Sequence, residues 1–252
     1  MTDQPTDTER LRTQTVSRRR PRSARRETVL ERAEILSCAV ALANAKGVDA
    51  VTMRSLAEAL GVSAMSLYAH VSDKDDILDA VIQARLEAIG LPDNALDWRP
   101  WMIELSRSLM ALLANEPALL DRYCRRPVRV PAALARMDSA LDRLLQAGFD
   151  DDEAVSAFAA THTYTIGFAA VCAARRGSVV RQANATGRFS GRQANEPTDP
   201  RAVFASLQVG DFPQLARLQP DLHGFTTDTQ FSVGLSALVD GLGDRRRGHR
   251  KA

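Results

Sequence analysis

Three polar side chains at alternate positions suggest the chemistry of this 252-residue chain. Ser66, Tyr68 and His70 follow a Gly-Val-Ser sequence at residues 61–63. A hydroxyl, a phenol and an imidazole can each form a hydrogen bond with a base edge or a phosphate oxygen. This set of side chains therefore indicates recognition of a nucleic acid.

The residues argue against catalysis. We find no nucleophile paired with a base, no glycine-rich phosphate loop and no metal-ligand spacing. The four histidines are scattered, at positions 70, 162, 223 and 249. We therefore expect no enzymatic activity, no metal and no cofactor.

Two short helices are expected to position the polar residues. Thr52 is placed to cap a helix over 53–60, which Gly61 ends, and Ser63 is placed to cap a second helix over 64–70. The apolar residues spaced to share one buried face are Leu56, Leu60, Val62 and Leu67. Such a pair is typical of a helix-turn-helix, whose second helix enters the major groove of DNA. A buried helical hairpin is the alternative.

Amphipathic helices are expected on both sides of this pair. One covers residues 30–45, with Gly47 as its stop. The other is a connecting helix over 73–88, opened by Ser72 with Asp75 as its capping-box partner. Residues 29–90 are thus predicted to form a three-helix DNA-binding domain with a connecting helix.

These residues resemble a known family, the tetracycline-repressor (TetR) family of bacterial regulators. The similarity lies in VTMRSLAEALGVS at 51–63, SLYAHV at 66–71, Lys74 and LDA at 78–80. QAGF at 146–149, THTYTIG at 161–167, FSVGL at 231–235 and residues 238–242 resemble the C-terminal domain of the tetracycline repressors. The resemblance covers most of residues 29–242.

The resemblance implies a set of DNA contacts. Thr52 and Arg54 correspond to backbone contacts at the start of the supporting helix, and Lys74 to a phosphate contact from the next helix. The recognition positions are Ala64, Met65, Ser66, Tyr68 and His70. Ala69 replaces the bulky aromatic residue of the tetracycline repressors, so their operator sequence is not transferable.

The rest of the chain reads as helices without strand-like alternation, which predicts an all-α protein. Residues 91–242 are expected to form a larger helical domain for effector binding and dimerisation, with helices at 97–116, 118–124, 132–147, 151–175 and 228–242. A mobile loop is expected over 177–200, and short helices near 203–209 and 212–218. The helix over 132–147 is expected to present an apolar stripe of Leu134, Met137, Leu141, Leu144 and Leu145.

In the resembled family, the counterparts of the helices at 151–175 and 228–242 form a four-helix bundle with those of a second copy. The resemblance therefore implies a homodimer. A two-fold dimer places two reading helices about one DNA turn apart, which predicts a near-palindromic operator. The alternative is that these helices complete a monomer core.

Six residues are candidates for the wall of an effector cavity: Trp101, Leu105, Leu109, Phe158, His162 and Thr165. For each of them, ordinary core packing is the alternative. The polar residues that hold magnesium-tetracycline in the namesake repressors are replaced by Gly90, Leu105 and Leu109. Magnesium-tetracycline is therefore not expected, and a more apolar effector fits better.

The termini are polar and basic. Residues 10–26 contain eight arginines and no acid, although the net charge of the chain is only +2. Residues 1–28 are expected to be a disordered arginine-rich arm that reaches DNA, with a solvated leader as the alternative. For the basic tail at 243–252 we favour a solvated role.

The sequence also predicts where the protein is located. The three cysteines lack metal-ligand spacing, and we find no signal peptide. No apolar run reaches the ~18 residues that a membrane span requires, so we expect a cytoplasmic protein with no membrane contact.

Together these observations predict a repressor released from a palindromic operator by a small-molecule effector. Effector binding would shift the connecting helix and misalign the two reading helices. The alternative is a DNA-binding dimer without such an effector, whose C-terminal domain serves only dimerisation or protein partners.

Overall fold

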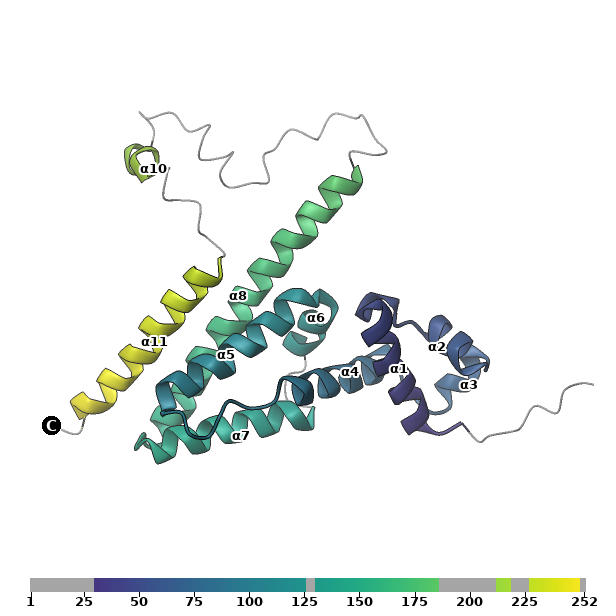
Figure 1. Ribbon diagram of the computed structural model, residues 1–252, viewed down its shortest axis with the longest axis horizontal. Coiled ribbons are helices and arrows are strands. Elements are labelled where there is room, and N and C mark those ends of the chain that lie inside the picture. The colour runs from purple at the N-terminus through teal and green to yellow at the C-terminus, as the bar shows by residue number, and fades with distance from the viewer. Residues whose placement is uncertain (1–29, 126–129, 186–211, 219–226, 250–252) are drawn as a thin grey trace, which may run out of the picture. The chain divides into compact units, whose positions relative to one another are not determined.

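The computed structural model describes residues 30–125, 130–185, 212–218 and 227–249, and every regular element in this part of the chain is a helix. The all-α prediction is confirmed for these residues. Figure 1 labels the helices along the chain. Their bounds are α1 Arg32–Lys46, η1 Val48–Ala50, α2 Met53–Leu60, α3 Ala64–Tyr68, α4 Lys74–Ile89, α5 Trp98–Asn115, α6 Pro117–Arg125, α7 Pro131–Gln146, α8 Asp151–Ala185, α10 Pro213–Leu218 and α11 Asp228–His249.

Helix α1 packs against α2 and α4 through a narrow stripe. Ile35, Ala39 and Ala43 are buried at a spacing of four, so they lie one turn apart on a single face. Gly47 ends the helix with φ of 84°, a value that L side chains rarely adopt, as its position in the sequence predicted.

Helix α4 begins at Lys74, one residue later than predicted. Asp73, not Ser72, is the N-cap, and its carboxylate accepts the N–H of Asp76 at 3.0 Å. The N–H of Ser72 donates to the Asp76 carboxylate at 3.0 Å. The predicted partner Asp75 makes no part of this cap. Two adjacent residues were suitable caps, and the carboxylate also interacts favourably with the helix dipole.

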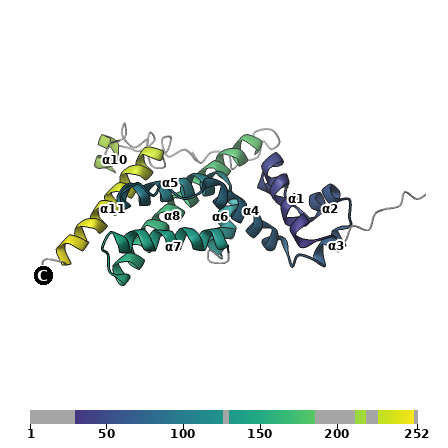
Figure 2. The ribbon, with the colours of Figure 1, turned by 60° about the horizontal axis from the view of Figure 1, so that its bottom comes forward.

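Helix α5 forms its most extensive contacts with α8, and α11 packs on both of them. Figure 2 shows the three helices together. Asp97 caps α5 by accepting the N–H of Trp98 at 2.8 Å. Trp101, Leu105 and Leu109 are buried along its inner face.

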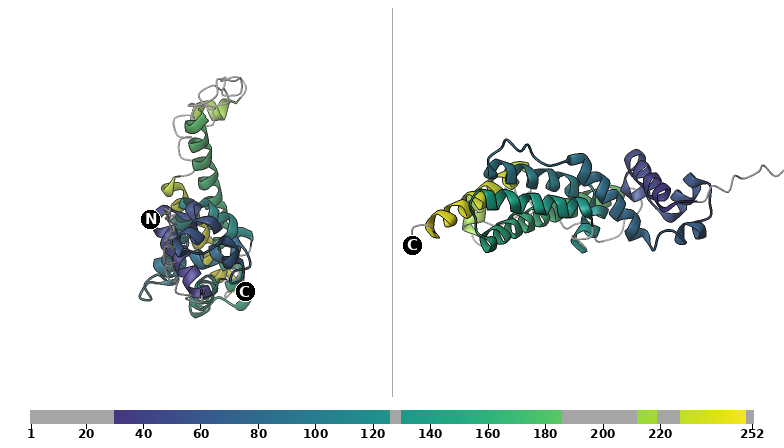
Figure 3. Two further views of the ribbon diagram at one scale, coloured as in Figure 1. Left: turned by 90° about the vertical axis from the view of Figure 1, so that its right-hand side faces the viewer. Right: turned by 90° about the horizontal axis from the view of Figure 1, so that it is seen from below.

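The inner face of α7 differs from the predicted one. Its buried residues are Ala133, Arg136, Ala140 and Leu144, whereas Leu134 and Leu145 are exposed. Three small or charged residues therefore contribute most of this face, and such residues produce no stripe of large apolar side chains in the sequence. Figure 3 shows α7 beside α8.

Helices α8 and α11 are both longer than predicted. Helix α8 spans 35 residues and continues to Ala185, so residues 177–185 are helical where a loop was expected. Helix α11 extends to His249 and so includes part of the expected basic tail. The arm at 1–28, the remainder of the expected loop and the short helix near 203–209 lie outside the described residues.

Within the described residues, one helical stretch has the length and composition to cross a membrane, residues 151–176 of α8. The sequence predicted a helix over 151–175 but no apolar run long enough to span a membrane. The same test is passed by core helices of globular proteins, so it is weak evidence for a membrane. Most of the stretch is not buried within one copy of the chain, which makes its exposed face relevant to assembly.

Candidate nucleic-acid interface and ligand site

The turn between α2 and α3 is fixed by local hydrogen bonds. The Thr52 hydroxyl accepts the N–H of Ser55 at 3.1 Å, and the Ser55 hydroxyl accepts the N–H of Thr52 at 3.0 Å. Gly61 ends α2 in the left-handed region, with φ of 66°. Ser63 then caps α3 by accepting the N–H of Ser66 at 3.1 Å. The predicted caps and stop are confirmed, and they set the direction in which α3 leaves α2.

Helix α3 is anchored by one side chain and exposes the others. Leu67 is fully buried and packs with the core that includes Leu56. Met65 is 81% exposed and Tyr68 is 53% exposed. Ala64 and Ser66 are exposed as well. An exposed methionine and tyrosine on so short a helix form a surface suited to an outside partner.

The remaining predicted DNA contacts flank this helix. Thr52 is the N-cap of α2, Arg54 is exposed in its first turn, and Lys74 is the exposed first residue of α4. Helix α3 ends at Tyr68, two residues earlier than predicted. His70 therefore lies in a turn just past α3, and its backbone N–H donates to the Leu67 carbonyl at 2.9 Å. The side chain of Ser66 bonds to that of Ser63 at 2.8 Å and thus also supports the cap.

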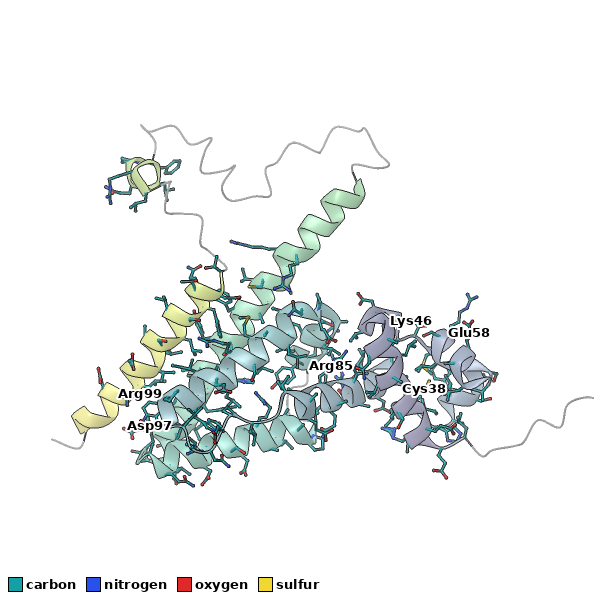
Figure 4. All side chains as sticks on the ribbon, viewed as in Figure 1. Cys38, Lys46, Glu58, Arg85, Asp97 and Arg99 are labelled. Atoms are coloured by element: carbon teal, nitrogen blue, oxygen red, sulfur yellow. The ribbon has the colours of Figure 1, made fainter. Side chains whose placement is uncertain are left out.

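Two arginines, neither of which was predicted to have a role, join α4 to its neighbours. Arg85 forms a 2.9 Å ion pair with Glu116 and also donates to Asn44 of α1. Figure 4 labels Arg85 on α4 near α1. Arg122 of α6 is 4% exposed and lies 2.6 Å from Asp79 and 3.7 Å from Asp75. Asp75 and Asp79 are four residues apart and share one helix face, a spacing that the sequence displays.

The six residues predicted to line an effector cavity lie in or near the packed core. Trp101, Leu105, Leu109 and Thr165 are buried, and the Thr165 hydroxyl donates to the Thr161 carbonyl at 2.7 Å. His162 stacks on Phe158 with 5.1 Å between ring centroids, and Tyr123 is 5.9 Å away. Burial, and secondarily the nearby Arg136 charge, lower the pKa of His162, so its imidazole is neutral at pH 7. Their role in ligand binding stays a prediction.

A pocket of about 300 Å³ lies between α4 and α7. None of the six predicted residues lines it. Its walls are Gln83, Leu86, Glu87, Gly90, Leu91, Pro131, Ala132, Ala135 and Arg136. Apart from Arg136, Gln83 and Glu87, these residues offer carbon atoms and backbone, which suits a largely apolar ligand.

Family models match both parts of the chain. Residues 35–81 match the family described as bacterial regulatory proteins, tetR family, and residues 91–246 match the tetracyclin repressor-like C-terminal domain. The chain belongs to the TetR family of transcriptional regulators. The resemblance stated from the sequence is therefore confirmed over both domains.

Several TetR-family proteins are similar over most of their length. An HTH-type transcriptional regulator of Saccharopolyspora erythraea is 35% identical over 88% of each chain. The tetracycline repressor protein class A from transposon 1721 of Escherichia coli is 31% identical, over 87% of this chain and 93% of its own. The crystal structure of the TetR family protein ActR of Streptomyces coelicolor in complex with (S)-DNPA matches with a TM-score of 0.64 and 25% identity, over 84% of this chain and 96% of that one.

Proposed function

We propose that this TetR-family regulator is a homodimeric repressor that binds a near-palindromic operator and leaves it when a small-molecule effector binds. The observation that carries the DNA-binding part is the exposed face of α3, held by the Ser63 cap and the buried Leu67. Tyr68 offers a hydroxyl for a phosphate or base, and Met65 offers an apolar contact for a thymine methyl group. Arg54 and Lys74 supply positive charge from the adjoining helices.

An uncovered face on α8 and α11 supports dimerisation. On α8 the exposed positions recur every four residues and are small or apolar, namely Val155, Ala159, Thr163, Gly167 and Val171. On the neighbouring α11 the exposed series is Val233, Ala237 and Gly241. Small residues let helices approach closely, and a second copy of the same face would bury the valines.

The ion pairs of α4 support control by an effector. Arg122 and Arg85 connect α4 to α6 and to Glu116, and Arg85 also reaches Asn44 in α1. A ligand that displaces α6 or α7 would therefore act on the helix that leads to the DNA-binding domain. The ActR structure with (S)-DNPA and the tetracycline repressor are precedents for ligand-bound and repressing relatives.

A dimer without a small-molecule effector is the second candidate. The observation that favours it is the burial of Trp101, Leu105, Leu109 and Thr165, which are predicted ligand residues. In this case operator binding would be insensitive to small molecules.

The test of DNA binding uses duplexes from the region upstream of the gene that contain an inverted repeat. Tyr68→Ala should weaken binding about tenfold or more in fluorescence anisotropy, because one recognition contact is worth about 1–3 kcal/mol. Lys46→Ala, which removes an exposed charge in the last turn of α1, is the matched control and should change affinity far less. Equal affinity of the wild type for the repeat and for a scrambled duplex would refute the proposal.

A further inference from the structure

Arg136 is a buried cation whose observed partners are all uncharged. It is 7% exposed, and its guanidinium donates to the Gly90 carbonyl, to the Leu105 carbonyl at 3.1 Å and to the Ser108 hydroxyl at 2.9 Å. Among the described residues, no carboxylate lies within 4.0 Å of it. Buried charges in proteins are normally paired, as Arg122 is with two aspartates.

The groups around Arg136 do not supply a counter-charge. Burial raises the pKa of Tyr123 to about 12, although Arg136 opposes this shift, so the phenol is neutral at pH 7. The lowered pKa of His162 keeps the imidazole neutral as well. Burial lowers the pKa of Arg136 itself. Its guanidinium nevertheless remains charged at pH 7 and would be stabilised by an incoming anion.

Arg136 also lines the pocket between α4 and α7, so an anion in the pocket would reach it. Leu86, Leu91 and Ala135 contribute apolar wall. Glu87 is the one acid of the lining; it is exposed and accepts a hydrogen bond from Gln83 at 2.5 Å. A ligand carboxylate next to Arg136 would thus pair with a cation that is shielded from water. The negative charge of Glu87 is screened by solvent and would repel such a ligand only weakly.

We propose that this pocket binds an apolar molecule that carries a single carboxylate, and that the carboxylate pairs with Arg136. The inference rests on the proposed function, because it names the chemical class of the effector. It also gives a route to α4. A carboxylate that takes N–H groups of Arg136 competes with the carbonyl of Gly90, which is the C-cap residue of α4.

A second bond crosses the same gap. The side-chain oxygen of Gln83 on α4 accepts the N–H of Ala132 on α7 at 2.8 Å. All four residues of these two hydrogen bonds line the pocket, so a ligand there lies against both bonds. Binding would loosen that attachment and change the position of α4.

The test compares benzoate, 2-naphthoate and decanoate with their primary amides, using calorimetry on the full-length protein. At least one carboxylate should bind about tenfold or more tightly than its amide, the range for a hydrogen bond to a charged group. Arg136→Gln should abolish this preference. Arg143→Gln is the matched control and should retain it, because Arg143 also lies on α7 and bonds to the Leu96 and Asn94 carbonyls but does not line the pocket.

A second variant guards against loss of folding in Arg136→Gln. Ala135→Phe fills the pocket from an exposed position and should abolish carboxylate binding while operator affinity is unchanged. Equal binding of acids and amides, or a preference that survives Arg136→Gln, would overturn the inference even if operator binding is intact. Failure of the wild type to bind any operator would instead overturn the proposed function. The calorimetry would still show whether the pocket binds carboxylates through Arg136.

Discussion

Removing Arg122 should destabilise the protein far more than removing its exposed neighbour Arg125. Arg122→Met keeps most of the volume of the side chain and deletes the charge that faces Asp79 at 2.6 Å. Asp79 is then left without its partner at the contact between α4 and α6. Arg125 pairs with Asp121 at 3.1 Å on the same helix, but both residues are exposed.

The burial of the pair sets the size of the effect. Removing one partner of a fully buried ion pair costs about 3–5 kcal/mol. Asp79 retains 23% exposure, so water stabilises part of its charge. In addition, Nε and Nη1 of Arg122 are buried without hydrogen-bond partners among the described residues, and the variant removes these unsatisfied groups. We therefore expect a loss of about 2 kcal/mol for Arg122→Met, against about 0.3–0.5 kcal/mol for Arg125→Met.

The assay is urea unfolding of each variant at one protein concentration, because the stability of a dimer depends on concentration. Asp79→Asn and the double variant complete a double-mutant cycle. The double variant should lose less than the sum of the two single losses, since the pair is lost only once. Equal losses in Arg122→Met and Arg125→Met, or strictly additive losses in the cycle, would refute the reasoning.

Two further predictions follow from the α8 helix. Gly167→Arg should convert the dimer to a monomer, as measured by light scattering. The helix content should be kept, because a Cβ at Gly167 meets no atom within 4 Å in a single copy. The control Ala111→Arg, on the exposed side of α5, should leave the dimer intact, and a Gly167→Arg variant that is still dimeric would show that this face is not the interface. His162→Phe should flatten the pH dependence of stability. The pKa of His162 is lower in the fold than the unfolded value of about 6.5, so the unfolded state takes up the proton first as the pH falls. The free energy of unfolding of the wild type should therefore decrease more than that of the variant below about pH 6.5, and parallel curves of unfolding free energy against pH would contradict the assignment.

The sequence predicted the features that depend on hydrogen bonds between near neighbours. Thr52 with Ser55, Ser63 with Ser66, and the left-handed Gly61 each involve residues at most three or four positions apart. Their geometry therefore depends on a short stretch of sequence, and for the same reason the start of α3 was predicted correctly. Ser72 and Asp73 show the limit of this reasoning, since both are good caps and the choice depends on how Asp76 completes the turn.

Features that depend on distant residues were not predicted. Arg122 and Asp79 are 43 positions apart, and neither residue indicates its partner by type alone. The inner face of α7 consists largely of alanines and Arg136, which carry little hydrophobic signal. The extension of α8 over 177–185 contains poor helix formers such as Gly177. Each residue added to an existing helix gains one backbone hydrogen bond without a new nucleation cost, and this gain outweighs the low helix propensity of these residues.

The single anchor of α3 has a consequence for how such regulators diversify. Because Leu67 is the one buried side chain of α3, replacements at positions 64, 65 and 68 alter the surface that we propose contacts DNA, at little cost in folding free energy. Descendants of one ancestral gene can therefore acquire new target sites by a few surface changes, while the core of the DNA-binding domain is inherited intact.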